Sequence, residues 1–247
     1  MNLKLGKLPA RHDPRTLRFA SYAPFDKLPA PPPSRDWSRS MPRQWGMMRN
    51  DQIGDCAFAA AAHLIQTWTA QTGKLITPSD GSVVAAYSAV TGYRPDRPET
   101  DAGANMLDVL KYWRTTGIDR HRITAFAAVE KDATHVKIAT NMFGGLYVGA
   151  MLPLSAQRQK GWLVPAILGP DDRAGSWGGH AMELVAYDRS GVTFVTWGRE
   201  QKASWAWFSS YVDEIYACIS PEWVDEHRRA PSGFDLDAML TDLSRLS

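Results

Sequence analysis

The stretch RNDQIGDCAFAAAAHLIQTW, Arg49–Trp68, places a cysteine where a turn gives way to a helical pattern. Gly54 and Asp55 provide the turn, and Cys56 follows as the first residue of the expected helix. Apolar residues then recur at the spacing of one helix face, namely Phe58, Ala61, Ala62, Ile65 and Trp68. The pattern predicts a buried helix that ends near Gly73. Cys56 is either a nucleophile at its start or a small apolar residue in the core.

The composition is that of an ordinary globular protein. The chain has 247 residues, of which 44% are hydrophobic and 22% are charged, and its formal net charge is +2. This small charge, without a dense stripe of Lys and Arg between aromatic residues, argues against a nucleic-acid partner. No apolar run is long enough for a membrane span, and the early Pro9 argues against a signal peptide. We therefore expect a chain that is cytoplasmic where it is synthesised and has no membrane partner.

Four segments differ in their residue patterns, and together they predict an α+β fold. Residues 1–45 are rich in proline and are expected to form an extended arm over the rest of the protein. Residues 46–144 carry helical patterns and predict a mainly helical lobe. Residues 145–228 predict an antiparallel β lobe from four strand patterns: GLYVGAML (145–152), HAMELVAYD (180–188), GVTFVTWG (191–198) and EIYACI (214–219). Residues 229–247 have the pattern of a C-terminal helix.

Cys56 and His180 have the chemistry of a nucleophile and a base. The partial positive charge of a helix N-terminus stabilises a thiolate, so its position is expected to lower the pKa of Cys56. His180 starts a strand behind two glycines, which leave its flank open to a bound chain or small molecule. A cysteine on a helix and a histidine on a strand can meet across a cleft. Taken singly, however, a cysteine or a histidine is more often structural.

Other reaction chemistries find little support in the sequence. The chain contains no HExxH, no CxxC and no tight cluster of Cys, His and Asp, so we expect no metal site. It also lacks the phosphate-binding pattern GxxxxGK[ST] and the serine hydrolase pattern GxSxG. The two cysteines, Cys56 and Cys218, lie far apart and fit a reducing compartment rather than a disulfide framework. We expect no cofactor.

Three short motifs follow one another along the chain: GDCAFAAA (54–61), GGHAMELVAYD (178–188) and TWG (196–198). In this order they resemble the motif regions of the papain-like cysteine peptidase superfamily, as in a remote bacterial or phage-type member. The arm residues KLGKLPARHDPRTLRFASY (4–22) and the pair Asp36-Trp37 are similar to the leader and the entry to the mature domain in bacterial members. The resemblance implies a papain-like fold, with a helical left lobe, a central Cys-bearing helix and an antiparallel β right lobe.

The same resemblance implies roles for several residues. Cys56 corresponds to the nucleophile and His180 to the general base. The family's oxyanion donor is a Gln six residues before the Cys, and that spacing corresponds here to Asn50. Gln52 has the family's residue type but lies only four residues before Cys56. Either side-chain amide could donate beside the backbone N–H of Cys56, and we favour Asn50.

The residue that holds the imidazole departs from the family pattern. The family has an Asn two residues before its shielding Trp, whereas this chain has Val195 there and Thr196 directly before Trp197. Thr196 can take this role only if the preceding hairpin is one residue shorter than usual. Trp197 matches the shielding Trp, and plain core packing remains an equal alternative for it.

Four residues are expected around the substrate cleft: Gly54, Asp55, Gly179 and Trp197. We interpret Asp55 as the cap of the helix. Glu183 is expected to face outward from its strand or to meet an arginine.

Two hypotheses of function remain. The first is a papain-like cysteine peptidase or thiol amide hydrolase whose substrate is a protein, a cell-wall peptide or a small acylated molecule. The second is a catalytically weak or inactive papain-like module with protein partners in a larger assembly, such as a phage virion or an effector assembly. The missing Asn and the shifted amide donor keep the second hypothesis open.

Overall fold

The computed structural model describes residues 3–22, 30–41, 44–224 and 230–232. The helices are α1 (Phe19–Tyr22), α2 (Cys56–Gln71), α3 (Asp80–Thr91), α4 (Met106–Thr115), α5 (Ala133–Phe143) and α6 (Trp205–Tyr211). The strands are β1 (Leu17–Arg18), β2 (Arg35–Asp36), β3 (Ala125–Ala128), β4 (Leu146–Leu152), β5 (Gly178–Tyr187), β6 (Gly191–Thr196), β7 (Arg199–Ser204) and β8 (Val212–Ile219). None of the helices in these ranges is long and apolar enough to cross a membrane.

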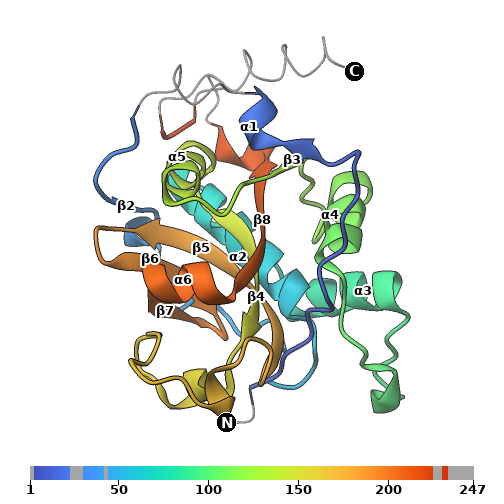
Figure 1. The fold of residues 1–247 in the computed structure, drawn as a ribbon. Coiled ribbons are helices and arrows are strands. Elements are labelled where there is room, and N and C mark those ends of the chain that lie inside the picture. The colour runs from blue at the N-terminus through green and yellow to red at the C-terminus, as the bar shows by residue number, and fades with distance from the viewer. Residues whose placement is uncertain (1–2, 23–29, 42–43, 225–229, 233–247) are drawn as a thin grey trace.

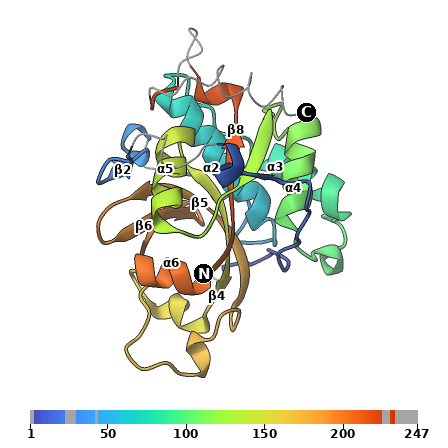
Figure 2. The ribbon, with the colours of Figure 1, turned by 45° about the horizontal axis from the view of Figure 1, so that its top comes forward.

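A single sheet organises these elements, in the order β1-β3-β8-β4-β5-β6-β7, with β2 added beside β5. Its strands pair antiparallel except for β1 and β3. Helix α2 packs against β4, β5 and β6, and α3 and α4 lie on the side of α2 away from β6 and β7 (Figure 1). The turned view in Figure 2 shows the same separation. The predicted α+β class and its central Cys-bearing helix are therefore confirmed.

The sheet separates two hydrophobic cores, because successive side chains of a strand point to opposite faces. On β5, Ala181 and Val185 join the core that contains α2, α3 and α4. Met182 and Leu184 join the other core, which α5 and α6 cover. Helix α2 is buried almost throughout, so its start is fixed against the sheet.

Four strands have no counterpart among the four expected strand patterns: β1 and β2 in the N-terminal arm, and β3 and β7 in the rest of the chain. Strand β3 lies within the segment expected to be mainly helical, and it pairs with β8. Strand β7 has the polar sequence REQKAS and pairs with β6 through six residues. β7 lies at the edge of the sheet, where polar residues are common. It has no regular alternation of apolar residues, and hydrogen bonds to β6 hold it in the sheet.

The N-terminal arm contributes β1 and β2 to the sheet. Most of the expected C-terminal helix, residues 229–247, lies outside the described residues. The expected division of the chain at residues 45, 144 and 228 stays a prediction.

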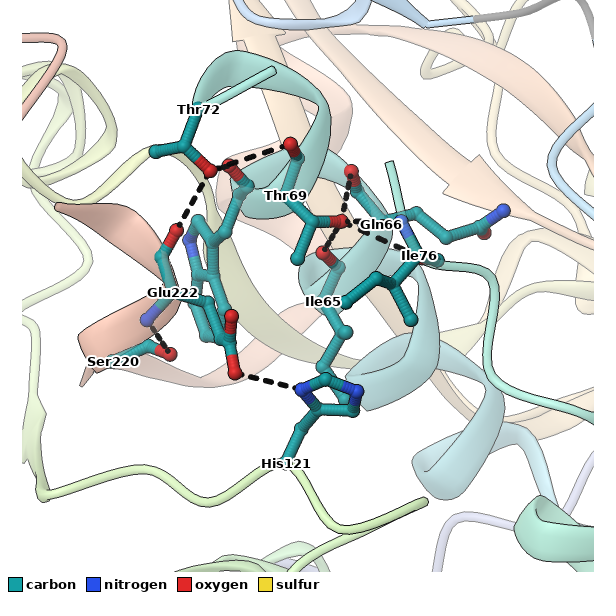
Figure 3. A network of polar contacts seen from close by, with 9 residues as sticks. Ile65, Gln66, Thr69, Thr72, Ile76, His121, Ser220 and Glu222 are labelled. Carbon is teal, nitrogen blue, oxygen red and sulfur yellow. Dashed lines mark hydrogen bonds and ion pairs between the residues drawn. The ribbon is translucent and has the colours of Figure 1, made fainter. Parts of the chain in front are cut away.

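Hydrogen bonds fix the C-terminal end of α2 (Figure 3). The hydroxyl of Thr69 donates to the carbonyl of Ile65 at 2.7 Å and accepts from the backbone N–H of Ile76 at 2.9 Å. One turn later the hydroxyl of Thr72 lies 3.4 Å from the carbonyl of Glu222. The Glu222 carboxylate is held by His121 at 2.7 Å. Segments far apart in the sequence thus meet at this end of the helix.

Glu183 is buried between β5 and α2, so the expectation that it faces outward or meets an arginine is wrong. The hydroxyl of Thr67 on α2 donates to its Oε1 at 2.6 Å. Glu183 shares the sheet face of Ala181 and Val185, which turns its side chain toward the helix. Burial raises the pKa of Glu183 to about 8, and the Thr67 bond opposes this rise only in part.

Replacing Thr69 with valine should destabilise the protein by about 1–3 kcal/mol, because the half-buried N–H of Ile76 loses its acceptor while the side-chain shape is kept. Equilibrium urea unfolding measures the change. The matched control is Thr115→Val in α4, where the exposed hydroxyl donates to the carbonyls of Lys111 and Tyr112 and, within the described residues, accepts from no backbone N–H. Equal losses for the two variants would contradict the role assigned to Thr69.

Replacing Glu183 with glutamine should flatten the dependence of stability on pH. The folded-state pKa of about 8 lies above the ordinary value of 4.5, so the contribution of Glu183 to stability is fully present below pH 4.5 and is lost as the pH rises from 4.5 through 8. The loss amounts to a few kcal/mol, since one pKa unit corresponds to about 1.4 kcal/mol. Unfolding curves at pH 4.5 and pH 8.5 measure it. Glu99→Gln, at an exposed carboxylate, should leave the slope unchanged, and an unchanged slope in Glu183→Gln would sink the interpretation.

Candidate active site

Cys56 is the first residue of α2 and is buried. The helix starts because the carbonyl of Asp55 accepts from the backbone N–H groups of Phe58 and Ala59. Asp55 occupies the N-cap position as expected, but its side chain makes no capping hydrogen bond. Burial raises the pKa of Asp55 well above its ordinary value, against a smaller opposite effect of the Asn50 side chain. The Asp55 carbonyl therefore bonds the first turn of α2, whereas the Asp55 side chain is buried beside Cys56 and does not cap the helix.

Strand β5 brings His180 to the start of α2. The backbone N–H of Ala181, the next residue in the chain, points at the Sγ of Cys56 from 3.4 Å. The His180 ring is buried and stacks on Trp197, with ring centroids 4.1 Å apart and an interplanar angle of 15°. The backbone that carries His180 therefore lies beside the Cys56 side chain, although the two residues are 124 positions apart in the sequence.

Thr196 holds one nitrogen of the His180 ring. Its Oγ1 lies 2.6 Å from Nε2, whereas Nδ1 is buried without a hydrogen-bond partner. Val195 packs in the core with α2, so the threonine and not the valine reaches the imidazole. The backbone then turns sharply, because Trp197 and Gly198 both have positive φ angles, of 47° and 70°.

The two candidate oxyanion donors lie in different environments. Asn50 is buried, and its Nδ2 donates to the carbonyl of Ile53 at 3.2 Å. Gln52 is exposed to solvent. Only Asn50 is therefore part of the buried surroundings of Cys56.

Three residues that the sequence analysis did not single out hold the turn before Cys56. Both carboxylate oxygens of Asp101 accept from the backbone N–H of Gly54 at 3.0 Å. The hydroxyl of Tyr87 donates to Asp101 at 2.5 Å and accepts from the N–H of Gly103 at 2.9 Å. No local pattern reveals these contacts, since Asp101 and Gly54 are 47 positions apart.

Residues 3–9, which we call the covering segment, run over this site. The backbone N–H groups of Gly6 and Lys7 lie 3.3 and 3.1 Å from the carbonyl oxygen of Gly179, directly before His180. On the opposite side, Ala104 donates to the carbonyl of Gly6 at 2.7 Å and accepts from Leu8 at 2.9 Å. The segment thus bonds as an extended peptide to both sides of the site.

Asn50 and Trp197 also contact the covering segment, through the backbone of Lys4. The backbone N–H of Lys4 lies 3.3 Å from the carbonyl of Asn50, and the indole N–H of Trp197 donates to the carbonyl of Lys4 at 3.0 Å. Candidate cleft residues therefore bind main-chain atoms of the segment.

The approach is close enough to require glycine. A Cβ atom on Gly6 would lie 1.8 Å from the carbonyl oxygen of Gly54, and one on Gly179 would lie 2.2 Å from that of Lys7. Both obstacles are backbone atoms, which cannot rotate away. The three expected cleft residues Gly54, Gly179 and Trp197 all contact the covering segment.

Burial also sets the charges of the site. It raises the pKa of the Cys56 thiol to about 12, and the helix start does not lower this pKa as the sequence analysis expected. Desolvation penalises the thiolate more than the N–H groups of Ala181 and Gly6 favour it. Burial likewise lowers the pKa of His180 to about 3. With the covering segment in place, thiol and imidazole are both neutral at pH 7.

The described residues hold no group of three or more His, Cys, Asp or Glu side chains that could bind a metal ion. The chemistry available at this site is that of a thiol, an imidazole and hydrogen-bond donors.

Comparison with known proteins places the fold. No family model and no curated protein matches the sequence. Among solved structures, xylellain, a cysteine protease from Xylella fastidiosa, is similar with a TM-score of 0.67 and 16% identity, over 89% of this chain and 97% of that chain. The digestive procathepsin L 3 of Tenebrio molitor larval midgut has a TM-score of 0.58 and 12% identity, over 88% and 76%. Procathepsin B S9 from Trypanosoma congolense has a TM-score of 0.58 and 10% identity, over 88% and 86%. The chain has the fold of the papain-like cysteine proteases.

Displacing the covering segment should make Cys56 reactive. Gly6→Ala adds a methyl group to the segment that collides with the carbonyl of Gly54. Gly179→Ala adds a methyl group to β5 that collides with the carbonyl of Lys7 in the segment. Water then reaches the thiol, its pKa falls, and alkylation by iodoacetamide at pH 7 should accelerate at least about tenfold. Peptide mass spectrometry resolves the labelling of Cys56.

Gly81→Ala is the matched control, because a Cβ atom there meets no atom within 4 Å. It should leave the labelling rate at the wild-type value. If both displacing variants label Cys56 no faster than this control, the covering segment does not limit access to the thiol.

Proposed function

We propose that this protein is a papain-like thiol peptidase or amide hydrolase that is held inactive by its own covering segment. The observation that carries the proposal is the meeting of α2 and β5, where the N–H of Ala181 contacts the Sγ of Cys56 and His180 directly precedes it. A nucleophile on a helix start and a base on a neighbouring strand are the parts that covalent catalysis of amide hydrolysis needs.

The hydrogen bond of His180 to Thr196 supports a base role for the free ring nitrogen. When the threonine oxygen accepts from Nε2–H, the neutral imidazole has its single proton there and Nδ1 can take the thiol proton. Thr196 then does for the ring what an amide does elsewhere in this fold, because a hydroxyl accepts the same N–H. The stacked Trp197 fixes the plane of the ring.

In the proposed reaction, the thiol proton of Cys56 moves to Nδ1 of His180, and the thiolate attacks the substrate carbonyl carbon. The oxyanion accepts from the backbone N–H of Cys56 and from the side-chain amide of Asn50, which in the resting protein donates to the carbonyl of Ile53. The C–N bond breaks as His180 returns the proton to the leaving amine. Water then hydrolyses the thioester with His180 as base.

The covering segment supports a polypeptide as the substrate. It is an extended peptide whose main chain already bonds to Gly179 and Ala104, so the same groups can align another peptide. Two of the similar solved structures are described as procathepsins, which is consistent with a form in which a segment covers the site. Among the first hypothesis's substrates, a peptide or protein fits better than a small acylated molecule.

The alternative of an inactive module in a virion or an effector assembly makes the opposite prediction for Cys56. No contact within the described part of the chain favours it. It remains the outcome to expect if an uncovered Cys56 behaves as an ordinary thiol.

The test uses Gly6→Ala, in which the added methyl group should displace the covering segment and open the cleft. This variant should hydrolyse fluorogenic peptides and should alkylate at Cys56 even below pH 7, because an imidazolium stabilises the thiolate. Adding His180→Ala should abolish both. Adding Thr196→Val should lower kcat by about tenfold or more and leave measurable activity, since the ring loses only its orienting bond.

Thr193→Val, at a half-buried threonine of the same strand, is the matched control and should leave the rates unchanged. Thermal melting establishes that each variant is folded. An open cleft in which Cys56 labels no faster than free cysteine, with no hydrolysis, would overturn the proposal.

A further inference from the structure

The side chain of Lys7 is fully buried, although it belongs to a segment at the protein surface. Its Nζ lies 2.8 Å from Oδ2 of Asp213 and 3.1 Å from Oε1 of Glu214, and it also donates to the carbonyl of Leu8 at 3.3 Å. By contrast, Lys4 in the same segment is exposed. One lysine of the covering segment thus fills a defined site, and the other does not.

The Lys7 side chain lies in a pocket with an apolar entrance and an acidic end. A Cβ atom on Gly149 would lie 2.2 Å from Cε of Lys7 and 2.7 Å from Sδ of Met106 and Cγ of Glu214. The lysine stem therefore runs along the bare backbone of Gly149, beside Met106, and its ammonium group meets the two carboxylates. Any larger residue at position 149 would fill the pocket.

The pocket is adjacent to the candidate active site. In the sheet, Gly149 pairs with Glu214 on β8 and with Ala181 on β5, the residue whose N–H contacts the Sγ of Cys56. The Lys7 charge is close enough to affect the thiol. A peptide that fills this pocket therefore lies over Cys56.

The pocket favours a cation over an apolar side chain of the same length. The Glu214 side chain is only 6% exposed. The hydroxyl of Tyr216 donates to its Oε2 at 3.0 Å, and Lys7 is its ionic partner. A buried carboxylate without a cation is costly, so an uncharged stem would leave Glu214 uncompensated. Asp213 is partly exposed and adds a second negative charge at the acidic end of the pocket.

We propose that this pocket is the specificity pocket of the enzyme and takes a Lys or Arg side chain of the substrate once the covering segment has left. The proposal rests on the proposed function, and it names the substrate class as peptides with a basic residue near the scissile bond. Lys7 occupies the pocket of the resting protein as a substrate side chain would. Glu214 and Asp213 are the residues that select the charge.

The first experiment measures binding without catalysis. The protein is the full chain with Gly6→Ala and Cys56→Ser, and the probe is the synthetic peptide LKLGKLPA, which copies residues 3–10. A second peptide has norleucine in place of Lys7, and a control peptide has norleucine in place of Lys4. Calorimetry should give a Kd at least about tenfold higher for the Lys7 replacement. The Lys4 replacement should bind like the parent peptide, because that side chain is exposed.

Variants that remove the charge of Glu214 or Asp213 test whether these carboxylates cause the difference in Kd between the Lys7 peptide and its norleucine analogue. In Glu214→Gln the ratio of the two Kd values should shrink toward one, and Asp213→Asn, at a partly exposed site, should shrink it less. If Glu214→Gln proves poorly folded by thermal melting, the Asp213→Asn ratio decides. Equal Kd values for the Lys7 and norleucine peptides would overturn the pocket.

The second experiment measures selection during catalysis. Gly6→Ala with Cys56 intact is given quenched fluorescent peptides in pairs, with Lys or norleucine at each position flanking the scissile bond. One position should show a kcat/KM ratio of at least about ten in favour of Lys, and Glu214→Gln should reduce that ratio. Peptide cleavage with no basic preference would overturn the specificity pocket while the proposed function stands. Lys-selective binding with no cleavage of any peptide would overturn the proposed function and support the pocket as a cation site.

Discussion

The contact between the N–H of Ala181 and the Sγ of Cys56 joins the two halves of this fold, and the chemistry proposed for it depends on that contact. Helix α2 is long and buried, and its start is fixed both by this contact with β5 and by the bonds of Asp101 to the backbone of Gly54. A second hydrogen bond between α2 and β5, from Thr67 to Glu183, keeps the helix and the strand aligned over more than two turns of α2. Bonds at the C-terminal end of α2 then prevent the helix from sliding along the sheet.

Burial has opposite effects on fold and reactivity. The close packing that aligns α2 and β5 also favours the neutral forms of Cys56 and His180, because both side chains are buried away from water. The covering segment is held over this site by main-chain hydrogen bonds, which other peptides could also form, and by the buried side chain of Lys7. One cleft can therefore serve both the resting protein and the active enzyme. In the proposed account, the carboxylates of Asp213 and Glu214 bind Lys7 of the covering segment in the resting protein and select a basic residue of the substrate in the enzyme.

The sequence predicted those parts of the site that local patterns encode. The Gly-Asp turn before Cys56 and the glycines before His180 lie next to the residues they position, and the α+β class followed from the change of periodicity. Interactions between distant residues could not be predicted in this way. Asp101 bonds Gly54 across 47 positions, and Glu214 pairs with Lys7 across 207. The expected fall in the Cys56 pKa is wrong for a related reason, because complete burial, which depends on residues far apart in the sequence, penalises the thiolate.

The central claim is that the covering segment controls the ionisation of the Cys56–His180 pair. NMR titration of the His180 ring in the wild-type protein and in Gly6→Ala measures this directly. In the wild-type protein the pKa of His180 should lie well below its ordinary value of 6.5, near 3, and in Gly6→Ala it should rise because water and a thiolate replace the covering backbone. Identical titration curves in the two proteins, with the segment shown to be displaced, would contradict the claim.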